Sequence, residues 1–339
     1  MRPPKKILVI RNDKLGDFML IFPALSLLKK AFPAAEIHAL VPEYTTPMAE
    51  LCLWIDHVVT DTSSHKLRNV FELVRLIKKY QFDAVIDFHP ETMTAIAVFL
   101  SRIPHRFAPA SRLVQMFYNR RLTQRRSYSQ KPEFEYNTDL ARFMIKHYVH
   151  GDTNTPAPPP YLVIAESQRM NTRNKYYESH NIDKNKKLVV IHPGSGGSAI
   201  TIALEDYAQL ISLLGSDHRL HFVITAGPGE EHIAHSLSEK IREFQNHVHV
   251  SDTGLRDFTE FLSIAYIFIS GSTGVLHIAG ALDVPTVAFY PEKQSATALR
   301  WRTLNSDNKY LAFTSEYSDN STIAISVNDC YKKIQECYL

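Results

Sequence analysis

Short apolar runs alternate with longer amphipathic stretches along most of the 339-residue chain, which is typical of parallel sheets connected by crossover helices. In the first half this pattern predicts strands over 6–10, 37–41, 57–60 and 84–87, with helices over 18–31, 66–80 and 91–101. In the second half it predicts strands over 188–192, 221–225, 248–250, 267–270 and 286–290, with helices over 204–214, 230–244, 257–265 and 275–282. The order of these elements predicts an α/β protein with two Rossmann-like units in tandem.

A proline-rich segment separates the two halves. Residues 151–160 contain four prolines and no hydrophobic periodicity, so we expect a stiff connector at or near a domain boundary. The chain is also longer than the size at which one core usually stops growing. We therefore expect an N-terminal domain over 1–160, a C-terminal domain over 161–320, and a final segment, 321–339. Its helix, over 327–338, could pack on either domain, including back on the N-terminal one.

The composition is that of an ordinary globular protein, with a net charge of only +3, which does not favour a nucleic-acid-binding protein. The three cysteines, Cys52, Cys330 and Cys337, are odd in number and lack metal-ligand spacing, so they indicate a reducing, cytosolic setting. The apolar run over 18–28 is too short to span a bilayer and contains Pro23. We expect a soluble protein that could still contact a membrane surface.

The most informative motif lies between two predicted strands of the second half. The first strand stops at Gly271-Ser272-Thr273-Gly274, and an apolar helix follows at once. Unpaired N–H groups and the positive end of the helix dipole at this turn favour an anion such as a diphosphate. The alternative is that Gly271 and Gly274 only permit a tight turn.

Two further turns of the second half could contribute to the same site. The sequence His192-Pro193-Gly194-Ser195-Gly196-Gly197-Ser198 follows a buried strand, and its N–H and hydroxyl groups can surround phosphate oxygens, although a mobile surface loop is the alternative. Glu230 follows the next strand and could bond a ribose hydroxyl, or could be a favourable acid in the first turn of a helix. His277 is either a core histidine or a phosphate donor.

In the first half, the first strand runs into a loop over 11–17 that ends in Gly16-Asp17. Ligands bind outside the carboxyl ends of parallel strands, so Asp17 is placed to act as a general base on a substrate hydroxyl. The alternative is that Asp17 caps the helix predicted to begin at residue 18. The sequence contains neither G-x-G-x-x-G nor the P-loop motif, which weakens the dehydrogenase and P-loop interpretations.

Basic residues gather in one part of the first half, interleaved with aromatic residues. Arginine suits carboxylate and phosphate groups, so this stretch predicts an anionic partner, with a solvated loop as the alternative. The basic residues are Arg102, His105, Arg106, Arg112, Arg120, Arg121, Arg125, Arg126 and Lys131. No H-x-x-x-H, H-E-x-x-H, D-x-D or G-x-S-x-G motif occurs, so the usual motifs for a structural metal, a metal-chelated nucleotide sugar or a serine nucleophile are absent.

Taken together, the motifs resemble those of glycosyltransferase family 9, the ADP-heptose:lipopolysaccharide heptosyltransferases. The matching segments are Leu15-Gly16-Asp17, His192-Pro193-Gly194-Ser195, Ser272-Thr273-Gly274-Val275-Leu276-His277-Ile278-Ala279 and Val284-Pro285-Thr286-Val287-Ala288-Phe289. The resemblance implies a GT-B fold, with two Rossmann-like domains of mostly parallel sheets facing a central cleft. It also implies inverting, metal-independent transfer of heptose from ADP-heptose to the lipopolysaccharide inner core, at the cytoplasmic face of the inner membrane. The partners would be a nucleotide-sugar donor, which is a substrate and not a cofactor, and an anionic glycolipid.

The resemblance also implies roles for individual residues. Asp17 matches the catalytic base. The donor-binding set is Gly194, Ser195, Gly196, Glu230, Ser272, Thr273, Gly274 and His277, and the acceptor-binding set is Lys14, Arg120, Arg121, Arg125 and Arg126. No metal ligand is expected.

Two positions depart from the family pattern. The lysine that many members carry after His-Pro-Gly-Ser is absent from Ser198-Ala199-Ile200-Thr201-Ile202, and Ser272 replaces a common acidic residue. Loss of a charge-assisted phosphate contact costs about 1.5–3 kcal/mol unless Lys293, Arg300 or Arg302 replaces it. A related transferase with another nucleotide sugar, or a non-catalytic nucleotide- or glycan-binding protein, is therefore an alternative.

Overall fold

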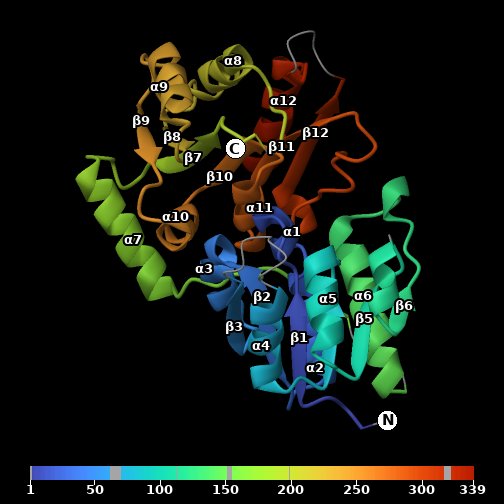
Figure 1. Cartoon of the computed structure of the whole chain (residues 1–339). Helices are drawn as coiled ribbons and strands as arrows, with labels where there is room; N and C mark the ends of the chain where they lie inside the picture. The colour runs from blue at the N-terminus through green and yellow to red at the C-terminus, as the bar shows by residue number, and fades with distance from the viewer. Residues whose placement is uncertain (1, 62–69, 112, 151–154, 198, 317–321) are drawn as a thin grey trace. The chain divides into compact units, whose positions relative to one another are not determined.

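The computed structural model describes residues 2–61, 70–111, 113–150, 155–197, 199–316 and 322–339. The chain divides into two compact units, Met1–Tyr161 and Leu162–Leu339 (Figure 1). Each unit contains one six-stranded sheet, and every pair of neighbouring strands in each sheet is parallel. The described residues leave out 66–69 of a predicted helix, 151–154 of the connector, Arg112, Ser198, and 317–321, where the predicted C-terminal domain ends and the final segment begins.

The sheet of the first unit has the strand order β3-β2-β1-β4-β5-β6. Its strands are β1 (Lys6–Ile10), β2 (Glu36–Pro42), β3 (His57–Asp61), β4 (Ala84–Asp87), β5 (His105–Pro109) and β6 (Arg120–Leu122). The four strands predicted from apolar runs are confirmed. The last two were missed because β5 begins with two polar residues and the three-residue edge strand β6 contains two arginines.

Helices cover both faces of this sheet. They are α1 (Leu15–Met19), α2 (Phe22–Ala31), α3 (Thr46–Glu50), α4 (Val70–Tyr80), α5 (Thr92–Leu100) and α6 (Glu133–Tyr148), with short 3-10 turns at Glu43–Thr45, Leu113–Phe117 and Arg126–Tyr128. Helix α4 buries Val70, Leu73, Val74 and Ile77, a spacing that forms one apolar stripe. Helices α4 and α5 lie over the near face of the sheet in Figure 1 and share its core with Leu8 and Ile10, while α2 packs on α6.

The helix predicted over 18–31 is interrupted. Helix α1 ends at Met19, and α2 begins at Phe22 with Pro23 in its first turn, where the missing N–H of proline is tolerated. Asp17 lies inside the first turn of α1, and Lys14 occupies the N-cap position. The interpretation of Asp17 as a helix cap is therefore wrong, because the helix begins before Asp17.

The sheet of the second unit has the order β12-β11-β10-β7-β8-β9, which repeats the topology of the first sheet. Its strands are β7 (Lys187–His192), β8 (Leu220–Ala226), β9 (Asn246–Val250), β10 (Ile267–Gly271), β11 (Thr286–Pro291) and β12 (Tyr310–Ser315). Its helices are α7 (Glu166–Ser179), α8 (Leu204–Leu214), α9 (Glu231–Lys240), α10 (Leu255–Leu262), α11 (Gly274–Ala281) and α12 (Val327–Tyr338), with a 3-10 turn at Asp307–Lys309.

The C-terminal helix α12 packs within the second unit. Its buried residues Val327, Cys330 and Ile334 belong to the apolar core of that unit, and α12 contacts α8. The apolar face of α12 is thus buried within the second unit, which is one of the two packings that the sequence left open.

The strand order places a switch point in each sheet, where the chain changes its direction of winding. In the first sheet it lies between β1 and β4, and in the second it lies between β7 and β10. Ligands of open α/β sheets bind beyond the carboxyl ends of the strands at such points. The loops after these four strands are therefore where the fold favours binding sites.

Candidate active site and donor loop

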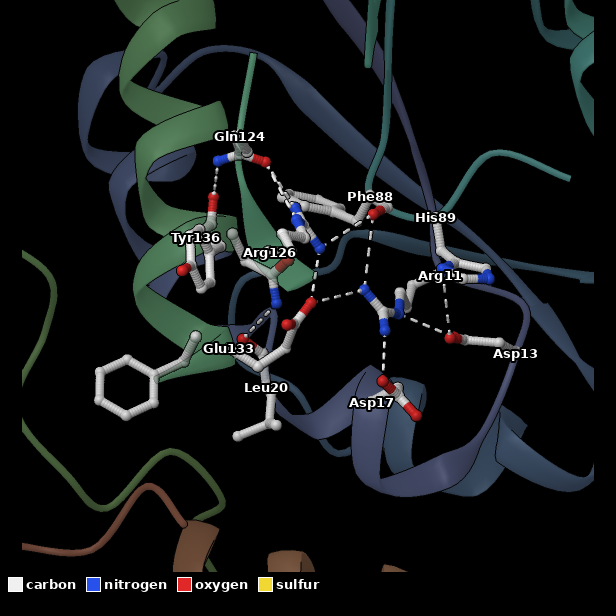
Figure 2. Close-up of polar contacts among 12 residues, drawn as sticks. Arg11, Asp13, Asp17, Leu20, Phe88, His89, Gln124, Arg126, Glu133 and Tyr136 are labelled. Atoms are coloured by element: carbon white, nitrogen blue, oxygen red, sulfur yellow. Dashed lines mark hydrogen bonds and ion pairs between the residues drawn. The ribbon is translucent and has the colours of Figure 1, made fainter. Parts of the chain in front are cut away.

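A buried arginine at the switch point of the first sheet is surrounded by carboxylates (Figure 2). Arg11 directly follows β1, and its Nη2 forms an ion pair with Oδ1 of Asp17. Its Nε donates to Oδ1 of Asp13 at 2.7 Å, and its Nη1 lies 3.7 Å from Oε1 of Glu133. One guanidinium therefore links the loop after β1, helix α1 and the start of α6.

Burial dominates the electrostatics of this cluster. It raises the pKa of Asp17 from its ordinary value to about 6, against the opposing effect of the Arg11 charge, while Asp13 and Glu133 raise it further. Burial lowers the pKa of Arg11, but attraction to Asp17, Asp13 and Glu133 outweighs it and raises that pKa overall. At neutral pH the guanidinium is charged and Asp17 is a carboxylate whose pKa suits proton transfer.

The Asp17 carboxylate keeps one oxygen for other contacts. Its Oδ1 pairs with Arg11, whereas its Oδ2 accepts no hydrogen bond among the residues that the structure describes. The side chain is 13% exposed, so it is restrained without being sealed from a substrate. This combination is that expected of a base oriented by a positioning group.

Arg126, one of the predicted acceptor-binding residues, belongs to this cluster. Its Nη1 donates to Oε1 of Glu133 at 2.5 Å, and its Nη2 donates to Oε1 of Gln124 at 2.8 Å (Figure 2). The remaining four residues have not been brought into this cluster. Arg121, Arg125 and Lys14 are exposed and Arg120 is half-buried; Arg120 and Arg121 lie on β6, and Lys14 precedes α1.

A second buried carboxylate ends the neighbouring strand β4. Asp87 accepts a hydrogen bond from the Tyr118 hydroxyl at 2.5 Å and one from the N–H of His89 at 3.0 Å. Burial raises the pKa of Asp87 to about 7, even though both hydrogen bonds and the charge of Arg11 act to lower it. Asp87 therefore titrates near neutrality beside the Arg11 cluster.

Sequence reasoning did not identify four members of this site: Arg11, Asp13, Asp87 and Glu133. Arg11 and Asp13 stand in the loop that was singled out, and Asp87 ends a predicted strand, so their position at strand ends was an available signal. Glu133 lies on α6, which was not predicted and whose contact with the first loop is long-range. No local pattern could have identified it.

In the second unit, backbone amides of the loop after β7 bind the side-chain carboxylate of Glu230. Oε1 of Glu230 accepts hydrogen bonds from the N–H groups of Ser195 and Gly196, at 2.9 and 2.7 Å. The amides predicted to surround phosphate oxygens thus converge on one anionic oxygen. Glu230, predicted to contact a ribose, lies at the N-cap position of α9 and organises this loop.

Glycines make this arrangement possible. A Cβ at Gly194 would clash with the Glu230 carboxyl group, so only glycine allows the carboxylate to approach so closely. Gly196 and Gly197 have φ values of +54° and +69°, which side chains disfavour. These glycines therefore set the backbone path of the turn over 194–197.

The turn after β10 forms the start of α11. Thr273 is the N-cap, and its hydroxyl accepts from the N–H of Leu276 at 3.4 Å and lies 3.2 Å from Oγ of Ser270. Gly274 is the first helical residue, and the half-buried Ser272 hydrogen-bonds to Tyr290. The buried capping side chain orients the helix start that was expected to meet a diphosphate.

Gly271 and His277 are both buried near this turn. A Cβ at Gly271 would lie 2.9 Å from the Thr201 side chain, so this glycine allows close packing of the two segments in addition to the turn. Burial lowers the pKa of His277 to about 4, and its Nδ1 has no hydrogen-bond partner among the described residues. His277 is thus a neutral, buried histidine whose Nδ1 has no partner among the described residues.

The cations considered as replacements for the missing loop lysine lie beyond β11. Lys293 is exposed, while Arg302 forms an ion pair with Asp307 and stacks over Tyr310. Arg300 is half-buried beside Trp301. Lys293 is the candidate whose side chain is most exposed to an incoming ligand.

Comparison with known proteins bears on the fold and the family of this chain. The model of glycosyltransferase family 9 (heptosyltransferase) matches residues 70–332. A Haemophilus influenzae protein, provisionally named a glycosyltransferase, is 43% identical over 313 residues, covering 91% of this chain and 89% of that protein. Lipooligosaccharide heptosyltransferase 2 of the same organism is 22% identical over 290 residues, covering 84% of this chain and 82% of that protein. The solved E. coli ADP-heptose LPS heptosyltransferase II has a TM-score of 0.76 at 16% identity, covering 98% of each chain.

The fold and the matches together show the class of protein and its family. The two units with Rossmann-like topology, together with the structural match, define a GT-B fold, as the resemblance implied. The chain belongs to glycosyltransferase family 9, because that family's model covers most of its length. In the parts that the structure describes, no helix has the length and apolar character that crossing a membrane requires.

Proposed function

We propose that this protein is an inverting glycosyltransferase that moves heptose from ADP-heptose to the inner core of lipopolysaccharide. The observation that carries the proposal is the buried Asp17 carboxylate, held by Arg11 beyond β1 with its pKa raised to about 6. The family's description as heptosyltransferase and the name of the 22% identical relative support heptose as the sugar.

In this mechanism Asp17 acts as the general base. Its Oδ2 accepts the proton of an acceptor hydroxyl while that oxygen attacks the anomeric carbon of the donor. The bond between the anomeric carbon and the phosphate oxygen breaks, and the sugar is transferred with inversion. Arg11 keeps Asp17 oriented through Oδ1, so the proton-accepting oxygen has a defined direction.

The leaving ADP carries the electron pair of the broken bond and therefore gains negative charge. The helix start at Thr273 and Gly274 supplies N–H groups and the positive end of a helix dipole for this charge. The amides of Ser195 and Gly196, now bonded to Glu230, belong to the same proposed donor site. We assign two roles to Glu230: it holds this loop in place, and it contacts the donor ribose. We assign His277 to binding the donor diphosphate. No metal ion is assigned a role in the transfer.

The acceptor is an anionic glycolipid in this proposal, and Lys14, Arg120, Arg121, Arg125 and Arg126 are its candidate contacts. Arg121 and Arg125 have the exposure that direct contact requires, whereas Arg126 supports Glu133. We place the reaction at the cytoplasmic face of the inner membrane, as the family resemblance implies, with peripheral contact through the acceptor.

The test is a transfer assay with ADP-heptose and deeply truncated lipopolysaccharide, with the product detected by mass spectrometry. We expect a mass increase of one heptose and stoichiometric release of ADP. Transfer only from a different nucleotide sugar would contradict the donor assignment while retaining the enzyme class. Binding of nucleotide without any product, from any donor offered, would instead identify a non-catalytic binding protein.

A further inference from the structure

Three side chains with metal-ligating atoms converge at the amino end of the first sheet. Glu36 and His38 are two residues apart on β2, so their side chains lie on the same face of the sheet. His57 begins the neighbouring edge strand β3 and is the register partner of His38. The strand pairing itself therefore brings a carboxylate and two imidazoles together.

The distances between the ligating atoms are compact. Oε2 of Glu36 lies 3.1 Å from Nε2 of His38 and 4.0 Å from Nε2 of His57. One ligand atom from each residue lies within 4.8 Å of the others. Zinc bonds of about 2.0–2.2 Å in a tetrahedral site place ligand atoms roughly 3.3–3.6 Å apart, so small side-chain movements would complete such a set.

The packing around His38 holds one ligand in place. Its side chain is only 3% exposed, and its ring lies edge-on to Tyr80 and Phe82, each with ring centroids 5.1 Å away. Its Nδ1 is buried without a hydrogen-bond partner among the described residues. Glu36 and His57 are about half exposed, so an ion can reach the group from solvent.

We propose that Glu36, His38 and His57 form a binding site for a divalent cation of the zinc class. Two imidazole nitrogens and one carboxylate oxygen are a common set of zinc ligands, and water completes the fourth position. The ion would join the edge strand β3 to β2. This site could not be found from sequence motifs, because the third ligand comes from a different strand.

A neighbouring lysine competes for the same carboxylate oxygen. Nζ of Lys6 lies 3.5 Å from Oε2 of Glu36, and Lys6 is the register partner of Glu36 on β1. A bound cation would repel this ammonium group. The lysine therefore weakens metal binding. Replacing it by an uncharged residue should make the site bind zinc more tightly.

The site is separate from the proposed chemistry. Glu36, His38 and His57 stand at the amino ends of their strands, whereas Arg11 and Asp17 follow the carboxyl end of β1. The proposal thus concerns a second site, and the transfer reaction is still assigned no metal.

The experiment measures zinc binding to the full chain, with any affinity tag removed and bound metals stripped by a chelator. Isothermal titration calorimetry gives the stoichiometry and affinity, and the visible absorption of added cobalt(II) reports tetrahedral coordination. We expect one zinc ion per chain, a raised melting temperature with zinc, and at least ~10-fold weaker binding by the exposed-site variants Glu36→Gln and His57→Ala. His150→Ala is the matched control, since His150 is an exposed histidine of the same unit.

Lys6→Gln separates this site from incidental zinc binding by the chain's other histidines, and it should bind zinc more tightly than the wild type. Zinc uptake by the wild type no stronger than that of His57→Ala overturns the proposal. So does Lys6→Gln binding that is no tighter than the wild type.

Discussion

Arg11 and Asp17 form a buried ion pair directly beyond the carboxyl end of β1. Two effects oppose each other at the carboxylate. Burial raises the Asp17 pKa, and the charge of the Arg11 guanidinium lowers it. The balance leaves that pKa near 6. A base with this pKa is ionised at neutral pH and still accepts a proton readily.

The activity should depend on pH through this carboxylate. Asp17 must be deprotonated to act, so kcat/KM should be constant above about pH 7 and fall ~10-fold per unit well below pH 6. Steady-state rates across this range provide the measurement. An acidic limb centred near pH 4, the ordinary value for aspartate, would show that burial does not control the base.

Arg11→Gln is the informative companion to this profile. The variant loses the charge that lowers the Asp17 pKa, so its acidic limb should move upward by roughly 1–3 units. A limb that stays in place would mean that the ionisation seen in the rate does not belong to Asp17.

Asp87 should make the first unit less stable as the pH rises. Because burial raises its folded-state pKa from 3.8 to about 7, its favourable contribution is complete below about pH 4 and is lost as the pH rises through 7. Asp87→Asn cannot ionise and so does not lose stability in this way. The free energy of unfolding of the variant minus that of the wild type should therefore increase between pH 5 and 8. The increase should be at most a few kcal/mol, since each pKa unit is worth about 1.4 kcal/mol.

The chain's two tryptophans make this measurable. In a Trp301→Phe background the remaining tryptophan, Trp54, lies in the first unit, so its fluorescence follows urea unfolding there. Glu72→Gln, at an exposed carboxylate of α4, is the matched control and should show no such pH trend. A parallel pH trend for Asp87→Asn and wild type would rule out Asp87 as the source.

The donor loop should be sensitive to a single methyl group. Gly194→Ala places a Cβ against the Glu230 carboxyl group and should displace it from the amides of Ser195 and Gly196. We expect the donor KM to rise ~10-fold or more with little change in the acceptor KM, because about 1.4 kcal/mol corresponds to a factor of ten. Gly227→Ala is the control, since its Cβ would meet the same carboxylate at an ordinary 3.8 Å. Equal donor KM values for the two variants would remove the loop from the donor site.

Exposed arginines should affect the acceptor more than the donor. Replacing Arg121 and Arg125 together by alanine should raise the acceptor KM roughly 10-fold or more and leave the donor KM nearly unchanged, since each charge-assisted contact is worth about 1.5–3 kcal/mol. Initial rates with each substrate varied in turn give both constants. Arg75→Ala, an exposed arginine of α4, controls for loss of positive charge. An unchanged acceptor KM would exclude these two residues from the acceptor site.

The elements predicted correctly are those whose buried residues form a recognisable apolar pattern in the local sequence. Strands such as β1 and β7 are continuous apolar runs, and α8 and α12 carry apolar stripes, so their bounds agree closely with the structure. Strand β6 and helix α7 were missed, because β6 is a short, arginine-rich edge strand and α7 has almost no apolar periodicity.

The site was predictable only where it follows strand ends. Asp17 and the loop of Gly194 stand after buried strands, where the fold favours ligands. Glu133 is different, because its role beside Arg11 arises from long-range packing of α6. Likewise, the hydrogen bonds of Glu230 to the loop amides depend on backbone geometry that glycine permits and no motif specifies.

Paired measurements on Asp17→Asn test the claim that Asp17 removes the acceptor proton. If Asp17 is the base, transfer from ADP-heptose falls at least ~10³-fold, while the dissociation constant for the donor, measured by calorimetry, changes less than ~3-fold. Turnover within ~10-fold of the wild type, with donor binding intact, would contradict the claim.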